Sequence, residues 1–426
     1  MKVLVLGSGA REHALAWKIA SSRRLSRLYS LPGNPGLSEL GELLPGDPED
    51  IEAVAATAAR LGIDLTVVGP EGPLVKGIAD GFRRRGLRLF GPTAAAARLE
   101  GSKIFSRRLL ARLGVPGPAY AVFDDPAAAF VYVERHGRPV AVKADGLAAG
   151  KGVLIAREVE AARAAVTCCM VDQVHGAAGS RVVIEELLSG EEVSALALVD
   201  GRRAWQLPSA RDYKRVGDGD QGPNTGGMGA CSPWPAYTPE LAVQVQTAVF
   251  DPVVRAMDQE GATFQGVLYA GLMLTPDGPK VLEFNVRLGD PEAQVILPRL
   301  EGDFLDLLEA ALDGRLDQVN LAVRPGACVS VVLASPGYPG AYPRGLPITG
   351  VDRAAALPGV MIFQGGTARD PDGRLVTAGG RVLAVTALGD TLDGAAALAY
   401  EAAAHIAFPG MQFRRDIAGP VAGERS

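Results

Sequence analysis

The sequence has few of the residues that build zinc sites, disulfide frameworks and histidine-dependent hydrolases. It contains four cysteines and four histidines in 426 residues. Cys168, Cys169, Cys231 and Cys328 show no Cys-x-x-Cys spacing, which indicates reduced, buried thiols rather than metal ligands. The histidines are widely scattered, which argues against a zinc centre and a Ser-His-Asp triad. The chemistry must therefore depend on lysine, arginine, carboxylates and backbone amides.

The sequence also lacks a block of positive charge and a long apolar run. The net charge is -5, and no basic stretch carries interleaved aromatic residues, so we expect no nucleic-acid partner. The first apolar run, Val3 to Leu6, is too short for a signal peptide, and no later run predicts a membrane span. We therefore expect a cytoplasmic protein with no membrane partner.

The composition is that of a large globular protein. Hydrophobic residues make up 48% and charged residues 21% of the chain, which can therefore bury extensive cores. A single core stops growing at roughly 250 to 300 residues, so we expect two or more packed units.

The N-terminal third reads as a parallel sheet. Val3 to Leu6 is followed by Gly7, Gly9 and a helix-period segment from about Arg11 to Ala20, a strand-turn-helix pattern. Further strands are expected at 27–30, 64–68 and 87–90, each running into glycine or proline. Ligands of such sheets bind outside the carboxyl ends of the strands, so these turns are expected to line a site.

A dinucleotide site is disfavoured at the first of these turns. Glu12 stands where the third glycine of Gly-x-Gly-x-x-Gly is needed, and the second strand ends Tyr29 to Pro32 without a ribose-binding acid. The glycines can instead cradle a smaller phosphate at the helix N-terminus, or they serve only as turns.

A second unit begins near Ala119 and contains a glycine loop between lysines. A strand at 140–143 ends in Lys143, a small-residue loop runs from Ala144 to Gly152, and 153–155 returns as a strand. Such a loop can place amides and ammonium groups on polyphosphate and exclude water. It is one residue short of a Walker loop and lacks the Ser/Thr after Lys151. An ordinary glycine hairpin is the alternative.

Two further stretches are polar in unexpected places. The apolar strand at 182–188 carries Glu185 and Glu186 and is followed by Glu191 and Glu192, acids that could contact adenine and ribose. An exposed edge strand would explain Glu186 and Glu191 equally well. From 211 to 229 the chain is polar and aperiodic, which predicts a functional loop or, alternatively, disorder.

A hairpin near residue 280 carries a candidate metal site. Strands are expected at 264–274 and 280–285, joined by a turn. Period-two spacing places Glu283 and Asn285 on one face, an arrangement of oxygen ligands that suits Mg²⁺. Arg287 follows on that face, although an isolated Glu-x-Asn also occurs in surface strands.

These motifs, in this order, resemble those of ATP-grasp enzymes. The whole chain resembles the phosphoribosylamine glycine ligases, also called glycinamide ribonucleotide synthetases. The likeness rests on segments at 7–14, 68–71, 143–152, 217–229, 283–292 and 379–383. Departures from the family pattern are Leu288, Cys231 and the stretch 364–367, which reads Gln-Gly-Gly-Thr and puts the role of that loop in doubt.

The resemblance implies a multidomain α/β and α+β fold. It begins with a doubly wound parallel sheet, continues as an ATP-grasp body with a small lid, and ends in a small mixed α/β domain. The implied bounds are 1–101 for the substrate domain, 102–119 and 188–326 for the ATP-grasp body, 120–187 for the lid and 327–426 for the C-terminal domain. That last domain is expected to hold a strand at 328–333 and a helix from Thr391 to about Ala407.

The resemblance also implies the reaction. Glycine is joined to 5-phosphoribosylamine with ATP, through glycyl phosphate, giving glycinamide ribonucleotide, ADP and phosphate in de novo purine biosynthesis. The implied cofactors are ATP and Mg²⁺ or Mn²⁺, the partners are these small molecules, and we expect a monomer.

Site residues follow from the matching motifs. We expect catalytic roles for Arg287, Lys143 and Asp212, and metal binding by Glu283 and Asn285. The expected ATP-binding residues are Lys103, Lys143, Gly150, Lys151, Gly152, Glu185, Glu186, Leu188 and Glu192. The expected substrate-binding residues are Gly9, Arg11, Gly33, Asn34, Glu71, Asp212, Lys214, Gly226, Gly227, Arg287, Gly289 and Asp290.

Two other functions are compatible with these motifs. A sibling ATP-grasp ligase would activate a different carboxylate, and a catalytically silent protein would bind ATP without forming product. The presence of Lys143, Glu283 and Asn285 together argues against the silent protein.

Overall fold

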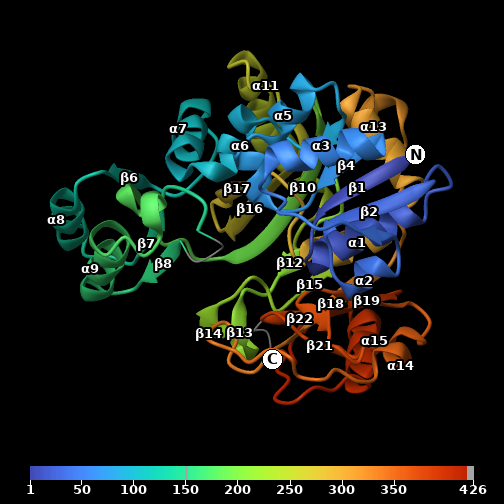
Figure 1. Ribbon diagram of the computed structural model, residues 1–426. Helices are drawn as coiled ribbons and strands as arrows, with labels where there is room; N and C mark the ends of the chain where they lie inside the picture. Colours follow the sequence, from blue (N-terminus) through green and yellow to red (C-terminus); the bar gives the residue numbers. More distant parts are fainter. Residues whose placement is uncertain (149–151, 420–426) are drawn as a thin grey trace.

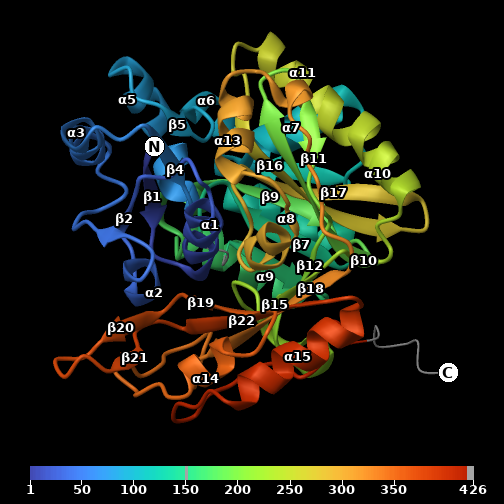
Figure 2. The same ribbon diagram turned by 90° about the vertical axis from the view of Figure 1, so that its right-hand side faces the viewer.

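The computed structural model describes residues 1–148 and 152–419. Figure 1 shows the N-terminal sheet at the upper right beside the central strands, the C-terminal sheet below them, and a small sheet projecting to the left. In the turned view of Figure 2, the C-terminal part lies beneath the other two. Within the described ranges, no helix combines the length and hydropathy needed to cross a bilayer.

The N-terminal sheet has the order β3-β2-β1-β4-β5, with every pair parallel. Its strands are β1 (Lys2–Gly7), β2 (Arg27–Pro32), β3 (Glu42–Leu43), β4 (Leu65–Val68) and β5 (Leu89–Phe90). Its helices are α1 (Ala10–Ala20), α2 (Pro35–Ser38), α3 (Ile51–Leu61), α4 (Glu71–Val75) and α5 (Ile78–Arg84). The expected strands are confirmed, and β1 is continuously apolar because helices cover such sheets on both faces. The strand order reverses between β1 and β4, so the turns that follow these two strands form a crevice.

The projecting sheet, here called the lid sheet, is antiparallel with the order β6-β9-β7-β8. Its strands are β6 (Tyr120–Phe123), β7 (Val140–Ala144), β8 (Val153–Ala156) and β9 (Val182–Glu186), packed against α8 (Pro126–His136) and α9 (Val159–Val166). A single π-helical turn, Thr167–Val171, continues α9 and holds Cys168 and Cys169. Because β9 lies between β6 and β7, the edge-strand explanation of Glu186 is wrong.

The central sheet has the order β11-β10-β16-β17 and is also antiparallel. Its strands are β10 (Glu191–Asp200), β11 (Ala204–Gln206), β16 (Gln265–Thr275) and β17 (Gly278–Asn285). The surrounding helices are α6 (Ala94–Gly101), α7 (Lys103–Leu113), α10 (Pro239–Val245), α11 (Asp251–Gln259), α12 (Glu292–Ile296) and α13 (Phe304–Leu312). Glu191 lies opposite Leu274 of β16, but β11 pairs only with residues 197–199 of β10, so Glu191 has a strand partner on one side and the edge explanation stays open there. The predicted hairpin at 264–285 is confirmed.

The segment 211–229 is not the structureless loop that its sequence suggested. It forms β12 (Arg211–Asp212), β13 (Arg215–Gly217), a 3₁₀ turn at 218–220 and β14 (Gln221–Asn224), and it leads into β15 (Gly229–Ser232). These strands are two to four residues long, too short to produce a readable period-two pattern.

The C-terminal sheet recruits two of those short strands. Its order is β12-β15-β18-β22-β19, and its own strands are β18 (Ala327–Ala334), β19 (Val360–Gln364) and β22 (Arg381–Gly389). Helix α15 (Leu392–Ala404) packs on β18 and β22, while α14 (Val351–Ala355) and the β20 (Thr367–Arg369) and β21 (Leu375–Thr377) pair complete this part. The expected strand and helix are confirmed, and the shared sheet joins the segment 211–232 to the C-terminal residues.

Candidate active site

A buried ion-pair group connects the lid sheet to the central sheet. Lys143 Nζ lies 2.9 Å from Glu185 Oε2, and Arg107 Nε lies 2.5 Å from Glu185 Oε1. Lys143 Nζ also donates to the carbonyl oxygen of Leu282 at 2.9 Å. Burial opposes ionisation of Glu185, but the two cations outweigh it and lower the pKa of that carboxyl. Burial, together with Arg107, lowers the pKa of Lys143. Two predicted ATP-binding residues thus meet directly beside β17.

Glu283 and Asn285 lie on β17 opposite Gly271 and Tyr269. Lys103 Nζ lies 3.7 Å from Glu283 Oε2. Burial would raise the pKa of Glu283, but Lys103, Lys214 and Lys143 lower it to about 2. An ionised carboxylate beside an amide oxygen fits a hard divalent cation. Among the described residues no cluster of three acidic, histidine or cysteine ligands occurs, so phosphate and water oxygens would have to complete the coordination.

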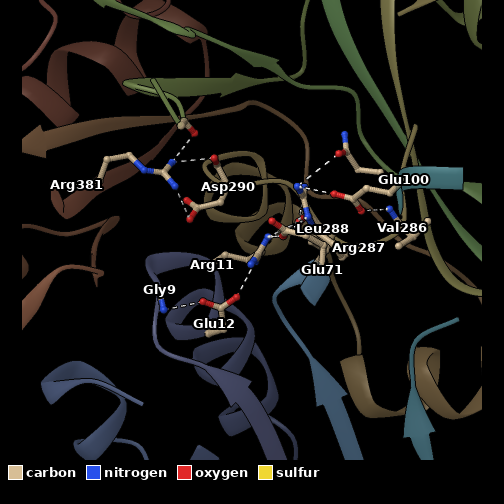
Figure 3. A network of polar contacts seen from close by, with 12 residues as sticks. Gly9, Arg11, Glu12, Glu71, Glu100, Val286, Arg287, Leu288, Asp290 and Arg381 are labelled. Carbon is tan, nitrogen blue, oxygen red and sulfur yellow. Dashed lines mark hydrogen bonds and ion pairs between the residues drawn. The ribbon is translucent and has the colours of Figure 1, made fainter. Parts of the chain in front are cut away.

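Arg287 connects Glu283 and Asn285, here called the metal pair because they are the candidate metal ligands, to helices α4 and α6 (Figure 3). Its guanidinium lies 3.2 Å from Glu71 Oε2 and 3.1 Å from Glu100 Oε1, and it reaches Asn285 Oδ1 at 3.4 Å. Burial would lower the pKa of Arg287, but Glu100 and Glu71 raise it, so the group is a fixed positive charge. Glu100, which also accepts from Val286 N at 2.8 Å, was not predicted.

Asp212 and Lys214 lie near enough to Glu283 for their charges to interact with it. Lys214 Nζ lies 2.5 Å from Glu192 Oε2, so a predicted substrate residue and a predicted ATP residue form one ion pair. Burial, helped by Glu292 and Glu192 and opposed by Lys214, raises the pKa of Asp212 to about 7. Asp212 can therefore exchange a proton near neutral pH.

A cavity of about 270 Å³ lies between the start of α1, the turn before α12 and the C-terminal sheet. Its lining includes Ser8, Gly9, Ala10, Asp290, Gln294, Gly365, Gly366 and Arg381. Arg381 donates to Asp290 Oδ2 at 2.9 Å, to the Asp290 carbonyl oxygen at 2.8 Å and to the Gly226 carbonyl oxygen at 2.6 Å. Arg381 thus joins the expected substrate residues Gly226 and Asp290, and neither it nor Gly365 and Gly366 had been predicted as site residues.

Glu12 explains physically why the first turn does not suit a dinucleotide. Its carboxylate accepts from Gly9 N and from Arg11 Nε, each at 2.6 Å (Figure 3). A Cβ on Gly69 would lie 2.1 Å from Glu12 Oε1, and one on Gly7 would lie 2.6 Å from Glu12 Cγ. Gly7 and Gly69 thus make room for Glu12, whose carboxylate occupies the Gly9 amide and puts a negative charge at the turn that would receive a pyrophosphate.

Gly33 and Asn34 lie near this turn, but Asn34 is committed to the fold. Its amide donates to the carbonyl oxygens of Ser8 at 2.8 Å and Gln364 at 2.7 Å, and its Oδ1 caps α2 through Leu37 N. The geometry thus makes Asn34 a brace between the N-terminal and C-terminal sheets, and its substrate contact stays a prediction.

The remaining expected residues are dispersed around the site. Glu186 Oε1 accepts from Ala119 N at 3.0 Å, and Leu188 lies between β9 and β10. The Gly152 carbonyl oxygen accepts from Ala144 N at 2.9 Å at the lid-sheet end of the loop. Gly150 and Lys151 lie outside the described residues. Gly227 has a φ of +110° and approaches Pro291, which explains glycine there.

Comparison with known proteins agrees with this architecture. Models of phosphoribosylglycinamide synthetase match three parts of the chain: the N domain at 1–100, the ATP-grasp (A) domain at 101–293 and the C domain at 328–420. A phosphoribosylamine–glycine ligase of Mesorhizobium japonicum is 52% identical over 98% of this chain and 97% of its own length. One from Brucella melitensis is 49% identical over the same shares.

Solved structures are similar in fold. The phosphoribosylamine–glycine ligase of Thermotoga maritima aligns with a TM-score of 0.84 and 35% identity over 98% of this chain and all of that one. The biotin carboxylase domain of the Hydrogenobacter thermophilus 2-oxoglutarate carboxylase aligns at 0.74 with 17% identity, over 97% and 91% of the two chains, which shows the fold alone.

Fold, site and comparisons define an ATP-grasp carbon–nitrogen ligase, a class of enzymes that use ATP with a divalent metal ion. Within that class the chain belongs to the phosphoribosylglycinamide synthetase family. The resemblance stated from the sequence is confirmed.

Proposed function

We propose that this site joins glycine to 5-phosphoribosylamine with ATP, giving glycinamide ribonucleotide, ADP and phosphate in purine biosynthesis. Family membership and the curated relatives support this reaction. The observation that carries it is the position of Arg287, which contacts Asn285 of the metal pair and is three residues from Asp290, which lines the cavity. Acyl activation and attack by an amine can then take place side by side.

Glycine must be activated before an amine can attack it, because its carboxylate has no good leaving group. Transfer of the terminal phosphoryl group of ATP to a carboxylate oxygen gives glycyl phosphate and ADP. The amine of phosphoribosylamine then attacks the acyl carbon, and phosphate leaves. Lys103, Lys143 and Arg287 supply positive charge where charge develops on the phosphoryl group, which is electrostatic positioning. Asp212, with a pKa of about 7, accepts the proton that the attacking amine loses.

Glu283 and Asn285 would hold a divalent cation, which supplies Lewis-acid neutralisation of phosphate oxygens. Magnesium suits a pair of oxygen ligands that leaves most coordination positions to phosphates and water. We further propose a cytoplasmic, monomeric enzyme.

Phosphoribosylamine fits the cavity between α1 and Arg381. The Ala10 amide begins α1, whose N-terminus favours anions, and Arg381 adds a cation, whereas the Gly9 amide is already bonded to Glu12. Gln294 also lines this cavity, and its amide donates to Asp290 Oδ1 at 2.7 Å, which fixes that carboxylate beside Arg381. In this arrangement residues 1–101 and 327–426 bind the sugar phosphate, 120–187 cover ATP, and 102–119 with 188–326 carry out the chemistry.

An ADP-release assay with each substrate omitted in turn tests the function. We expect ADP only when glycine, phosphoribosylamine and ATP are all present. Equal turnover with another amino acid or carboxylic acid in place of glycine would instead identify a sibling ATP-grasp ligase.

A further inference from the structure

Glu292 is a buried carboxylate that the proposed reaction does not use. It opens helix α12 and is only 3% exposed. Within the described part of the chain, no lysine, arginine or histidine nitrogen lies within 4.0 Å of it. A carboxylate buried without a cationic partner is costly, so its retention in this cleft needs an explanation.

One oxygen of Glu292 is held by two hydroxyl groups. Tyr269 OH donates to Glu292 Oε1 at 2.6 Å, and Ser194 Oγ lies 3.0 Å from the same oxygen and 2.8 Å from Tyr269 OH. Burial and the charges of Glu292 and Asp212 raise the pKa of Tyr269, so its hydroxyl keeps its proton and stays a donor. These contacts fix the orientation of the carboxylate, and they leave Oε2 without a donor among the described residues.

Gly289 provides the space in which Oε2 lies. A Cβ on Gly289 would stand 2.2 Å from Glu292 Oε2. Gly289 lies in the chain between Arg287, which contacts Asn285, and Asp290, which lines the cavity, so Oε2 lies against the segment that connects these two residues.

The other acids around the site already have partners. Glu283 pairs with Lys103, Glu192 with Lys214, and Asp290 with Arg381, while Glu71 and Glu100 share Arg287. Asp212 remains, but its pKa of about 7 suits a proton acceptor better than a fixed anion. Glu292 is therefore the acid in this cleft that is free to meet a cationic substrate group.

Resting on the proposed function, we infer that Glu292 binds the ammonium group of glycine through Oε2, with Tyr269 and Ser194 as positioning residues for that carboxylate. Glycine is a zwitterion, so its site needs an anion as well as the cations that hold its carboxylate. The contact keeps the glycine nitrogen protonated, and a protonated amine cannot compete with phosphoribosylamine as nucleophile.

The test compares glycine with hydroxyacetate, which replaces the ammonium with a hydroxyl. In Glu292→Gln the KM for glycine should rise about 10- to 100-fold, the range expected for a lost charged hydrogen bond. The kcat and the KM for ATP should change less than about threefold, because the substitution removes a contact to glycine and none to ATP. The preference for glycine over hydroxyacetate, measured as the hydroxyacetate inhibition constant divided by the glycine KM, should shrink by the same factor as the glycine affinity.

That ratio separates recognition from support of the fold. A variant that only loosened the site would weaken both ligands equally, and an unchanged ratio would overturn the inference. Tyr269→Phe keeps the charge and frees the carboxylate, so it should lower the ratio by a smaller factor, and an unchanged ratio there would also count against it. Glu191→Gln removes a neighbouring acid that pairs with Arg211 at 3.0 Å, and it should leave the ratio unaltered. If the unmodified enzyme made no ADP with glycine and phosphoribosylamine, the proposed function itself would fail.

Discussion

Two groups of charged side chains flank β17 and differ in how their charges balance. The first, here called the cation cluster, holds Lys103, Arg107 and Lys143 against Glu185 and Glu283. The second, here called the acid cluster, consists of the carboxylates of Asp212, Glu192 and Glu292 and the ammonium group of Lys214. The cation cluster has more positive than negative groups, and the acid cluster has the reverse.

The difference shows in the pKa values of two acids that are both partly buried. Burial raises the pKa of both Glu283 and Asp212, but nearby lysines outweigh it for Glu283, whose pKa falls to about 2. Neighbouring carboxylates add to it for Asp212, whose pKa rises to about 7. In the proposed reaction the cation cluster suits polyphosphate and the acid cluster suits an amino group.

The largest effect is expected from Glu283→Ala in the cation cluster. Loss of an ionised metal ligand should lower kcat/KM by about a thousandfold or more, because charge on the transferring phosphoryl group is no longer neutralised. Circular dichroism should report an intact fold. Full activity in this variant would remove Glu283 from the metal site.

A smaller, pH-dependent effect is expected from Asp212→Asn in the acid cluster. If Asp212 must be ionised, kcat/KM of the unmodified enzyme rises with pH up to about 7 and then levels, and the variant loses this inflection together with most of its activity. The measurement is kcat/KM of both proteins from about pH 5.5 to 8.5, a range that spans the expected inflection. ATP binding measured in the same buffers is the control.

The same substitution predicts a stability change of known sign. Folding raises the pKa of Asp212 from 3.8 to about 7, so the unmodified protein loses stability as the pH rises through this interval. The variant lacks that titration. Its melting temperature, relative to the unmodified protein, should therefore increase between about pH 4 and pH 7 and stay level above. A constant difference over this range would show that Asp212 is not perturbed.

Much of the frame was readable from sequence because it depends on local pattern. The strand-turn-helix start at Val3, the hairpin that carries Glu283 and Asn285, and the apolar strand at 328–333 are each visible in a few residues. The family resemblance then implied the order of the domains.

Other features depend on residues far apart in the chain. Arg381 meets Gly226 and Asp290 only because β22 and β15 share a sheet, and no spacing encodes that contact. The edge-strand explanation of Glu186 could be rejected only once strand order was known. Glu292 is two residues after Asp290, an expected substrate-binding residue, yet its place in the site depends on Tyr269 and Ser194 from two other strands.

The smallest effect is expected at an exposed ion pair. Comparing it with a buried pair tests whether the stability lost on breaking an ion pair depends on burial or on pairing alone. On the outer helices of the lid sheet, Arg163 pairs with Glu134, and both side chains are nearly half exposed. Solvent screens such a pair, so Glu134→Ala should cost about 0.5 kcal/mol or less and leave kcat/KM unchanged. The matched buried change, Glu185→Gln, leaves Lys143 and Arg107 without their shared carboxylate, which is 2% exposed, and should cost about 3 kcal/mol. Urea unfolding of both variants measures the contrast. Similar losses in the free energy of unfolding would mean that the contribution of an ion pair to stability does not depend on its burial.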